Sequence, residues 1–114
     1  MKGINKKEIL NETKFLKWLK KNPNKKFCVA NAEMCPVAQF VLEKTGVGIV
    51  EVGWGDVIGR NNEDDVESPI FNWNWPSWVE KFVEDFDDKF NEIKPNNNHL
   101  KRVSGKRIVR ELGL

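Results

Sequence analysis

Residues 27–54 read FCVANAEMCPVAQFVLEKTGVGIVEVGW, and this stretch predicts a short strand, a helix and a second strand. Residues 27–29 are apolar and follow a polar turn, which is typical of a strand. Pro36 indicates a helix start, because proline is favoured at the first helical position, and Gly46 indicates the end of that helix. Residues 47–52 are rich in β-branched side chains and predict the second strand. A parallel crossover and an antiparallel arrangement with a third element both fit this pattern.

A helix is expected before this stretch and a long connection after it. Asn11 or Thr13 is a suitable N-cap for the first helix, and Pro23 ends it because proline disfavours helical angles at the preceding residue. Residues 53–76 are expected to form a long connection, part of which packs against the core because it carries several apolar side chains.

The second half of the chain predicts two more helices. Ser77 and Glu80 have capping-box spacing, and Pro95 closes the helix that they begin. Its apolar face comprises Trp78, Val79, Phe82, Val83, Phe86, Phe90 and Ile93. Ser104 is a candidate N-cap for a last short helix.

Together these elements predict an α+β fold in which about four helices pack on a small two- or three-stranded sheet. Residues 1–114 are expected to form a single domain, in which residues 59–68 and 95–103 are mobile. No apolar run is long enough to span a membrane, and the lysine-rich start lacks the apolar segment of a signal peptide. We therefore expect a cytoplasmic protein, in the host cytoplasm if the source is viral.

No residue pattern in the sequence indicates a catalytic, cofactor or metal site. Cys28 and Cys35 predict two reduced, partly buried thiols rather than a disulfide. The single histidine, His99, lies far from both cysteines, so neither a zinc site nor a catalytic triad is indicated. Residues 60–65 are polar and acidic but lack the ligand spacing and central glycine of a calcium-binding loop. We expect a protein that is not an enzyme and uses no cofactor.

Charge is strongly segregated along the chain. Residues 1–30 have a net charge of +7, residues 31–93 of −10 and residues 94–114 of +5, which together give the net charge of +2. One interpretation is that the basic ends fold back on the acidic middle and neutralise it. Exposed ion pairs contribute little stability each, so this arrangement would act mainly on orientation and solubility.

A second interpretation is that the acidic middle binds a basic surface of another protein, such as the surface with which a nucleic-acid-binding enzyme holds phosphates. Tryptophan is enriched at interface hot spots. Trp78 is expected in the core, whereas Trp73 and Trp75 fit either the core or an exposed anchor. The predicted partner-binding residues are Glu63, Asp64, Asp65, Glu67, Trp73, Trp75, Glu80, Glu84, Asp87 and Asp88.

A third interpretation is that the basic ends bind nucleic acid, provided that they converge on one face. The chain has no helix-turn-helix, zinc-finger or RNA-binding signature, so the sequence favours a protein partner over nucleic acid. The candidate nucleic-acid-binding residues are Lys14, Lys17, Lys21, Lys25, Lys26, Lys101, Arg102, Lys106, Arg107 and Arg110.

Three short motifs resemble a loose group of small uncharacterised phage, prophage and bacterial proteins. Residues 13–19 read TKFLKWL in the opening helix, and residues 35–42 read CPVAQFVL, of the form Cys-Pro-x-Ala-Gln-Phe-x-Leu. Residues 104–112 read SGKRIVREL, of the form Ser/Thr-Gly-x-x-apolar-apolar-x-x-Leu. The resemblance implies an accessory protein of a virus or mobile element, without a known activity. This resemblance and the acidic charge of residues 31–93 together lead us to expect a protein that inhibits or modulates a host or defence factor.

Overall fold

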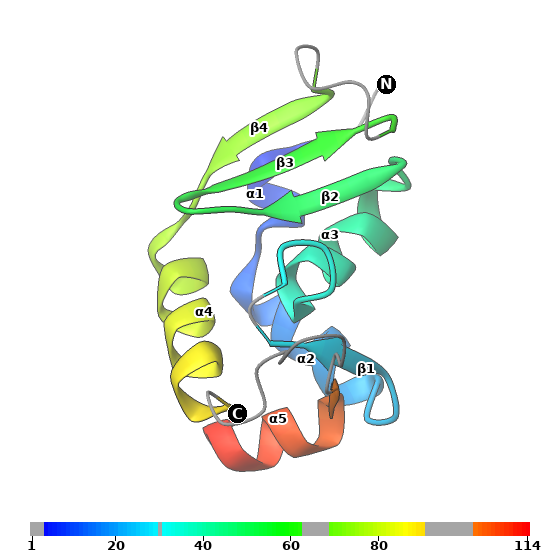
Figure 1. Ribbon diagram of the computed structural model, residues 1–114. Coiled ribbons are helices and arrows are strands. Elements are labelled where there is room, and N and C mark those ends of the chain that lie inside the picture. The colour runs from blue at the N-terminus through cyan, green and yellow to red at the C-terminus, as the bar shows by residue number, and fades with distance from the viewer. Residues whose placement is uncertain (1–3, 30, 63–68, 91–101) are drawn as a thin grey trace, which may run out of the picture.

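The computed structural model describes residues 4–29, 31–62, 69–90 and 102–114, and it confirms a single α+β domain. Figure 1 shows a three-stranded sheet at one end of the molecule, a two-stranded sheet with the last helix at the other, and α2, α3 and α4 between them. The elements in chain order are α1 (Lys6–Ile9), α2 (Glu12–Lys21), β1 (Lys26–Cys28), α3 (Pro36–Thr45), β2 (Ile49–Val52), β3 (Asp56–Arg60), β4 (Phe71–Asn74), α4 (Ser77–Lys89), β5 (Arg102–Ser104) and α5 (Gly105–Leu112).

Both sheets are antiparallel, and the two strands predicted from residues 27–54 lie in different ones. β1 pairs with β5, so that Phe27 lies opposite Val103, whereas β2, β3 and β4 form a meander. The parallel crossover that the sequence also allowed is therefore wrong. The reason is local: Gly53 and Gly55 let the chain turn back directly after β2, and the returning segment supplies an antiparallel partner.

The connection expected over residues 53–76 contains two strands that the sequence pattern did not reveal. β3 reads DVIGR and β4 reads FNWN, and both mix polar residues or glycine with their apolar ones, so neither forms a β-branched run like that of residues 47–52. Residues 59–68 and 95–103 were expected to be mobile. Residues 59–60 instead belong to β3, and residues 102–103 belong to β5. Residues 63–68 and 95–101 lie outside the described part of the chain.

Three predicted helix boundaries are confirmed. Asn11, and not Thr13, caps α2, because its side-chain oxygen accepts the N–H of Lys14 at 3.0 Å. Ser104 caps α5 by accepting the N–H three residues on at 3.2 Å. Gly46 ends α3 with a left-handed φ of 72°, which glycine adopts without a steric penalty.

The predicted capping box at Ser77 and Glu80 is wrong. Pro76 occupies the N-cap position of α4, and its carbonyl oxygen accepts the N–H of Val79 at 3.0 Å. Ser77 is already the first helical residue, so its hydroxyl is one position too late to cap the helix.

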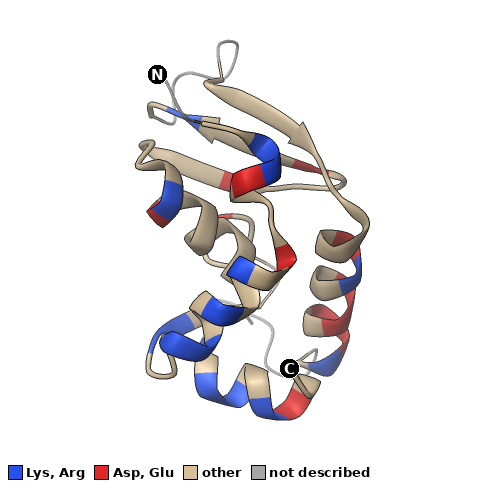
Figure 2. Cartoon of the chain, turned by 180° about the vertical axis from the view of Figure 1, so that it is seen from behind, with Lys and Arg blue, Asp and Glu red and all other residues tan. Residues whose placement is uncertain are grey.

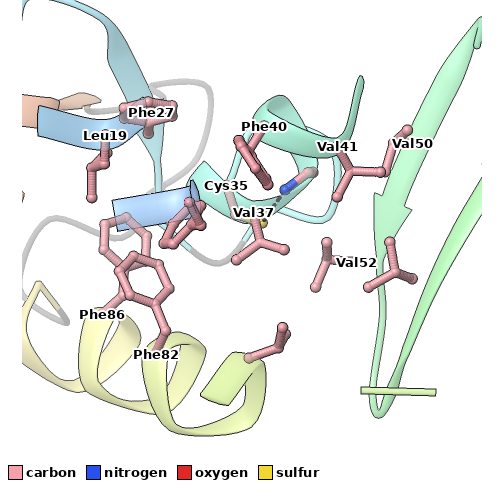
Figure 3. Close-up of a cluster of buried hydrophobic side chains, with 14 of the residues drawn as sticks. Leu19, Phe27, Cys35, Val37, Phe40, Val41, Val50, Val52, Phe82 and Phe86 are labelled. Atoms are coloured by element: carbon pink, nitrogen blue, oxygen red, sulfur yellow. Dashed lines mark hydrogen bonds between the residues drawn. The ribbon is translucent and has the colours of Figure 1, made fainter. Parts of the chain in front are cut away.

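The core centres on Phe15 of α2. Its ring centroid lies 5.4 Å from that of Phe40 in α3 and 4.9 Å from that of Phe82 in α4, so three helices meet on one aromatic side chain. On the other side of α3, Val41 faces Val50 of β2 (Figure 3). α3 therefore joins the helices to the three-stranded sheet, and its two ends reach different surfaces.

Several glycines allow close approaches between parts of the fold, among them Gly59 and Gly105. A Cβ atom at Gly59 would overlap the ring of Phe71, its partner across the β3–β4 pair. A Cβ atom at Gly105 would overlap the carbonyl oxygen of Asn22, where the start of α5 meets the end of α2. The second contact holds the two basic ends of the chain together.

Candidate functional site

A cavity of about 410 Å³ opens between α4, the first turn of α3 and the end of β2. Its walls are mainly apolar, and they include Pro36, Val52, Phe82, Val83 and Phe86. Binding cavities in proteins typically measure about 300–1,000 Å³ and are lined mainly by apolar side chains. This cavity is therefore large enough to take one or two apolar side chains of a partner.

Trp54 stands at the rim of this cavity with its whole side chain in solvent, at a relative exposure of 101%. It is the middle residue of the turn between β2 and β3, where Gly55 has a φ of 96°. The turn is held from both sides: the N–H of Gly53 donates to the carbonyl of Asp56 at 2.9 Å, and the N–H of Trp75 donates to the carbonyl of Gly55 at 2.9 Å. The exposed indole is therefore carried by a braced turn.

The tryptophans around the start of α4 divide between the cavity and the core. Trp75 lines the cavity, and its indole N–H donates to a backbone carbonyl of β3 at 2.8 Å. Trp73 is half-buried on the sheet, with its ring centroid 4.0 Å from that of Phe71. Trp78 packs against the core as expected and donates its indole N–H to the carbonyl of Leu10 at 3.2 Å. Of the two tryptophans in the predicted site, only Trp75 reaches the cavity.

Sequence reasoning did not select Trp54, the most exposed of the large apolar side chains in the described residues. A signal was present, because Trp54 lies between Gly53 and Gly55. Glycines on both sides mark the tip of a tight turn, where a large side chain has no neighbours to cover it. The Gly-Trp-Gly pattern thus points to an exposed anchor more directly than the Trp-rich segment that follows.

The acidic side of α4 borders the cavity. Asp87 lines the cavity. Successive residues of an α-helix are about 100° apart around its axis, so Glu80 lies about 20° and Glu84 about 60° from Asp87. Glu80 and Glu84 are exposed, and we call these three residues the acidic stripe. Asp88 is exposed and lies about 100° from Asp87 but only about 40° from Glu84, so it continues the acidic side of the helix away from the cavity. The other predicted acidic residues lie outside the described part of the chain and are Glu63, Asp64, Asp65 and Glu67.

Cys35 forms part of the cavity wall and caps α3, since its Sγ accepts the N–H of Ala38 at 3.4 Å (Figure 3). Burial raises the pKa of this thiol from 9.0 to about 11; the hydrogen bond from Ala38 opposes the shift and the charge of Asp87 adds to it. A thiol that stays protonated at neutral pH is a poor nucleophile and metal ligand. Cys28 is also buried, and both cysteines are free, which confirms the prediction of two unbridged thiols.

The basic ends of the chain come together at the opposite end of the molecule from the three-stranded sheet. The N–H of Gly105 donates to the carbonyl of Lys25 at 2.9 Å, and the N–H of Lys106 donates to that of Pro23 at 3.0 Å. Figure 2 shows the lysines and arginines of α2, β1 and α5 gathered there. The predicted nucleic-acid-binding residues that lie on or directly beside α2, β1, β5 and α5 are Lys14, Lys17, Lys21, Lys25, Lys26, Arg102, Lys106, Arg107 and Arg110. Lys101 lies outside the described residues.

Ion pairs in α4 and α5 are local. Lys81 Nζ lies 3.1 Å from Asp85 Oδ2 within α4, whereas Arg107 and Arg110 both pair with Glu111 within α5. The hydrogen bond from Arg107 lowers the pKa of Glu111 below its usual value. These pairs neutralise charge within one helix and do not join the basic ends to the acidic stripe, so they do not support the interpretation that the two zones cancel each other.

Comparison with protein-family models, with curated proteins and with solved structures finds no match for this chain. Within the described ranges, no three His, Cys, Asp or Glu side chains are grouped so as to hold a metal ion. Among the helices that the structure describes, none has the length and apolar character needed to cross a bilayer. The case for a function therefore rests on the cavity, its exposed rim and the two charged surfaces.

Proposed function

We propose that this chain is a non-catalytic accessory protein that acts by binding another protein at the cavity between α3, β2 and α4. The observation that carries the proposal is the fully exposed Trp54 on the cavity rim. The docking site consists of the cavity, Trp54 and the acidic stripe of Glu80, Glu84 and Asp87.

An exposed tryptophan on a braced turn is better suited to binding than to folding. Burying a tryptophan removes roughly 150–250 Å² from water, which corresponds to about 4–6 kcal/mol at about 25 cal/mol per Å². Trp54 contributes none of this to the free energy of folding, because its side chain is in solvent. A partner that covers the indole gains that free energy, less the cost of association. Tryptophan is for this reason common among binding hot spots.

The cavity and the charge beside it favour a partner with an apolar side chain flanked by lysine or arginine. The apolar group would enter between Pro36 and Phe86, while the cationic groups would face the acidic stripe. Nucleic-acid-binding proteins present basic surfaces of this kind. Together with the resemblance to phage and prophage accessory proteins, this chemistry makes inhibition or modulation of a host or defence factor the outcome that we propose.

Panning a random-peptide display library against the purified protein tests the docking site without a known partner. We expect the enriched peptides to carry an apolar residue flanked by Lys or Arg, and to bind Trp54→Ala at least about tenfold more weakly. Ile70→Ala is the matched control, because Ile70 is also an exposed large apolar residue but does not line the cavity. Peptides that lack basic residues, or that bind Trp54→Ala as well as the parent, would contradict the proposal.

A pair of charge reversals tests the acidic stripe separately. Glu84→Lys places a like charge opposite the basic groups of the enriched peptides, so binding should fall about tenfold at low salt. Asp85→Lys changes the net charge equally on the same helix but lies at least about 100° round the helix from Glu80, Glu84 and Asp87, and it should cost less than about threefold. Equal losses in the two variants would show that overall charge, rather than the stripe, attracts the peptides.

A further inference from the structure

A second hollow, of about 460 Å³, lies along α2 and the end of α3 and has basic walls. Lys14, Lys17 and Lys21 line it from α2 at spacings of three and four residues, which place them on one side of the helix. Lys44, in the last turn of α3, lines it as well. We call these four side chains, all exposed, the lysine groove.

The lysines of the groove outnumber the carboxylates beside them. Within residues 4–29, 31–62, 69–90 and 102–114, the ion pairs join other residues, and none involves the four groove amines. Glu8 also lines the hollow, and the carboxylate of Glu43 accepts the indole N–H of Trp18 at its floor, so four lysines lie beside two carboxylates. Lys44 Nζ lies 5.9 Å from the ring centroid of Phe40.

The floor of the groove is aromatic but closed to ligands. Trp18 and Phe40 are only 6% and 1% exposed, so neither ring has a free face on which a base could stack. The indole N–H of Trp18 already donates to Glu43 and is not free to reach the edge of a base. The groove therefore recognises charge, and it has no means of distinguishing one base from another.

The positive surface continues from the groove towards β1 and α5. Asn22 lines the end of the groove, and its carbonyl accepts the N–H of Lys25 at 3.2 Å. The carbonyl of Lys25 in turn accepts the N–H of Gly105 at 2.9 Å. Exposed basic side chains beyond this junction are Lys26, Arg102 and Lys106.

The extended shape of this surface fits a linear polyanion better than a small anion. Lys14 and Lys21 are separated by about 10 Å along the axis of α2, which equals the axial rise of about three nucleotides in one strand of a duplex. A small anion is usually held by several converging donors that are shielded from water. The groove lysines are instead exposed and follow one another along the surface.

We propose that the lysine groove and the basic surface that continues from it bind the phosphate backbone of nucleic acid without regard to sequence. Lysine amines would contact phosphate oxygens and release counterions. The buried aromatic floor makes no contact with the bases, so binding would not depend on sequence. The residues that line the groove are different from those that line the cavity of the docking site, so this proposal is independent of the proposed function.

Fluorescence anisotropy with labelled 20-nucleotide probes tests the proposal. The probes are single-stranded DNA, duplex DNA and RNA, each in two unrelated sequences, titrated with the full chain from 50 to 300 mM salt. We expect a Kd of about 1–100 µM near physiological salt, equal within about threefold for the two sequences of each probe. The combined variant Lys14→Gln, Lys17→Gln, Lys21→Gln should bind at least tenfold more weakly at 50 mM salt. Its slope of log K against log salt should be shallower by about 2 to 3.

The matched control removes three exposed lysines from other surfaces, through Lys6→Gln, Lys81→Gln and Lys89→Gln. It has the same net charge as the groove variant and should keep its affinity within about threefold, while circular dichroism checks that both variants are folded. Equal losses in the two variants would overturn the proposal, as would absence of binding at 50 mM salt. Binding to phosphatidylserine vesicles but to none of the nucleic acids would assign the surface to a membrane and would also overturn it.

Discussion

Phe71 packs across the sheet over the backbone of Gly59, and this contact explains a glycine that would otherwise weaken a strand. Glycine lowers strand stability because it has no side chain to pack and loses more backbone entropy on folding. Here the ring of Phe71 occupies the space that a side chain would need. Phe71 in turn stacks on Trp73, so the ring that occupies the space above Gly59 is itself packed against a second aromatic side chain.

Gly59→Ala should lower the free energy of unfolding by about 1–3 kcal/mol, because the new methyl group must displace the ring of Phe71. Urea denaturation followed by circular dichroism measures the loss. In a Phe71→Ala background the same substitution should cost less than about 1 kcal/mol, because the ring is gone. An equal cost in both backgrounds would show that the contact is not the cause.

Cys35 makes stability depend on pH in the alkaline range. Its pKa is raised from 9.0 to about 11 on folding, so the folded state favours the protonated thiol. The contribution is complete below pH 9 and is lost as the pH rises towards 11, with a total of roughly 2–3 kcal/mol. Cys35→Ser keeps a helix cap but has no group that titrates in this range. Denaturation curves at pH 8, 9, 10 and 11 should show a smaller decrease in this variant, and parallel decreases would refute the assignment.

At the scale of elements, the sequence predicted those helices and strands whose ends carry their own chemistry. Pro36 and Ser104 mark helix starts by residue type alone, and these starts were predicted correctly; for the first helix the sequence allowed Asn11 or Thr13, and Asn11 is the cap. The strands β3, β4 and β5 were missed because each mixes apolar with polar residues or glycine and is stabilised by a partner rather than by its own composition. The start of α4 was misplaced because Ser-x-x-Glu spacing also occurs one residue inside a helix that begins after proline.

Substitutions at the helix starts test which residues act as caps. Asn11→Ala and Ser104→Ala should each lower the free energy of unfolding by about 1 kcal/mol, because each removes a side-chain oxygen that accepts a backbone N–H. Ser77→Ala should change it by less than about 0.5 kcal/mol, since Ser77 does not cap α4. Thermal and urea denaturation of the three variants measure these differences. If Ser77→Ala lowered the free energy of unfolding as much as the other two substitutions, Ser77 would have to cap α4 after all.

At the scale of the whole molecule, the sequence showed that charge is segregated but not which charges share a surface. The basic ends meet because β1 pairs with β5 and because Gly105 fits against Asn22. Both contacts join residues that are far apart in the chain, and no local pattern predicts them. The cavity depends in the same way on three elements, α3, β2 and α4, and Trp54 becomes its rim only when they are assembled.

Gly105→Ala should separate the two proposed surfaces. The added methyl group meets the carbonyl of Asn22, so we expect a loss of about 1–3 kcal/mol in unfolding free energy and at least threefold weaker binding of nucleic acid. Peptides selected on the docking site should bind as before, because the cavity does not include this junction. Gly113→Ala is the control: it lies in open space at a φ of 68° and should cost about 1 kcal/mol without affecting either ligand. If peptide binding falls together with nucleic-acid binding, the surfaces are coupled.

The pairing of β1 with β5 also bears on how the protein is made. The partner strand of β1 is translated about 75 residues after it, which takes roughly 4–15 s at about 5–20 residues per second. During that interval Phe27 has no second strand to cover it, and the backbone of β1 presents an unpaired edge. Until β5 has been made, β1 is therefore an exposed strand edge in the nascent chain, and slow translation would lengthen the period in which it is open to misassembly.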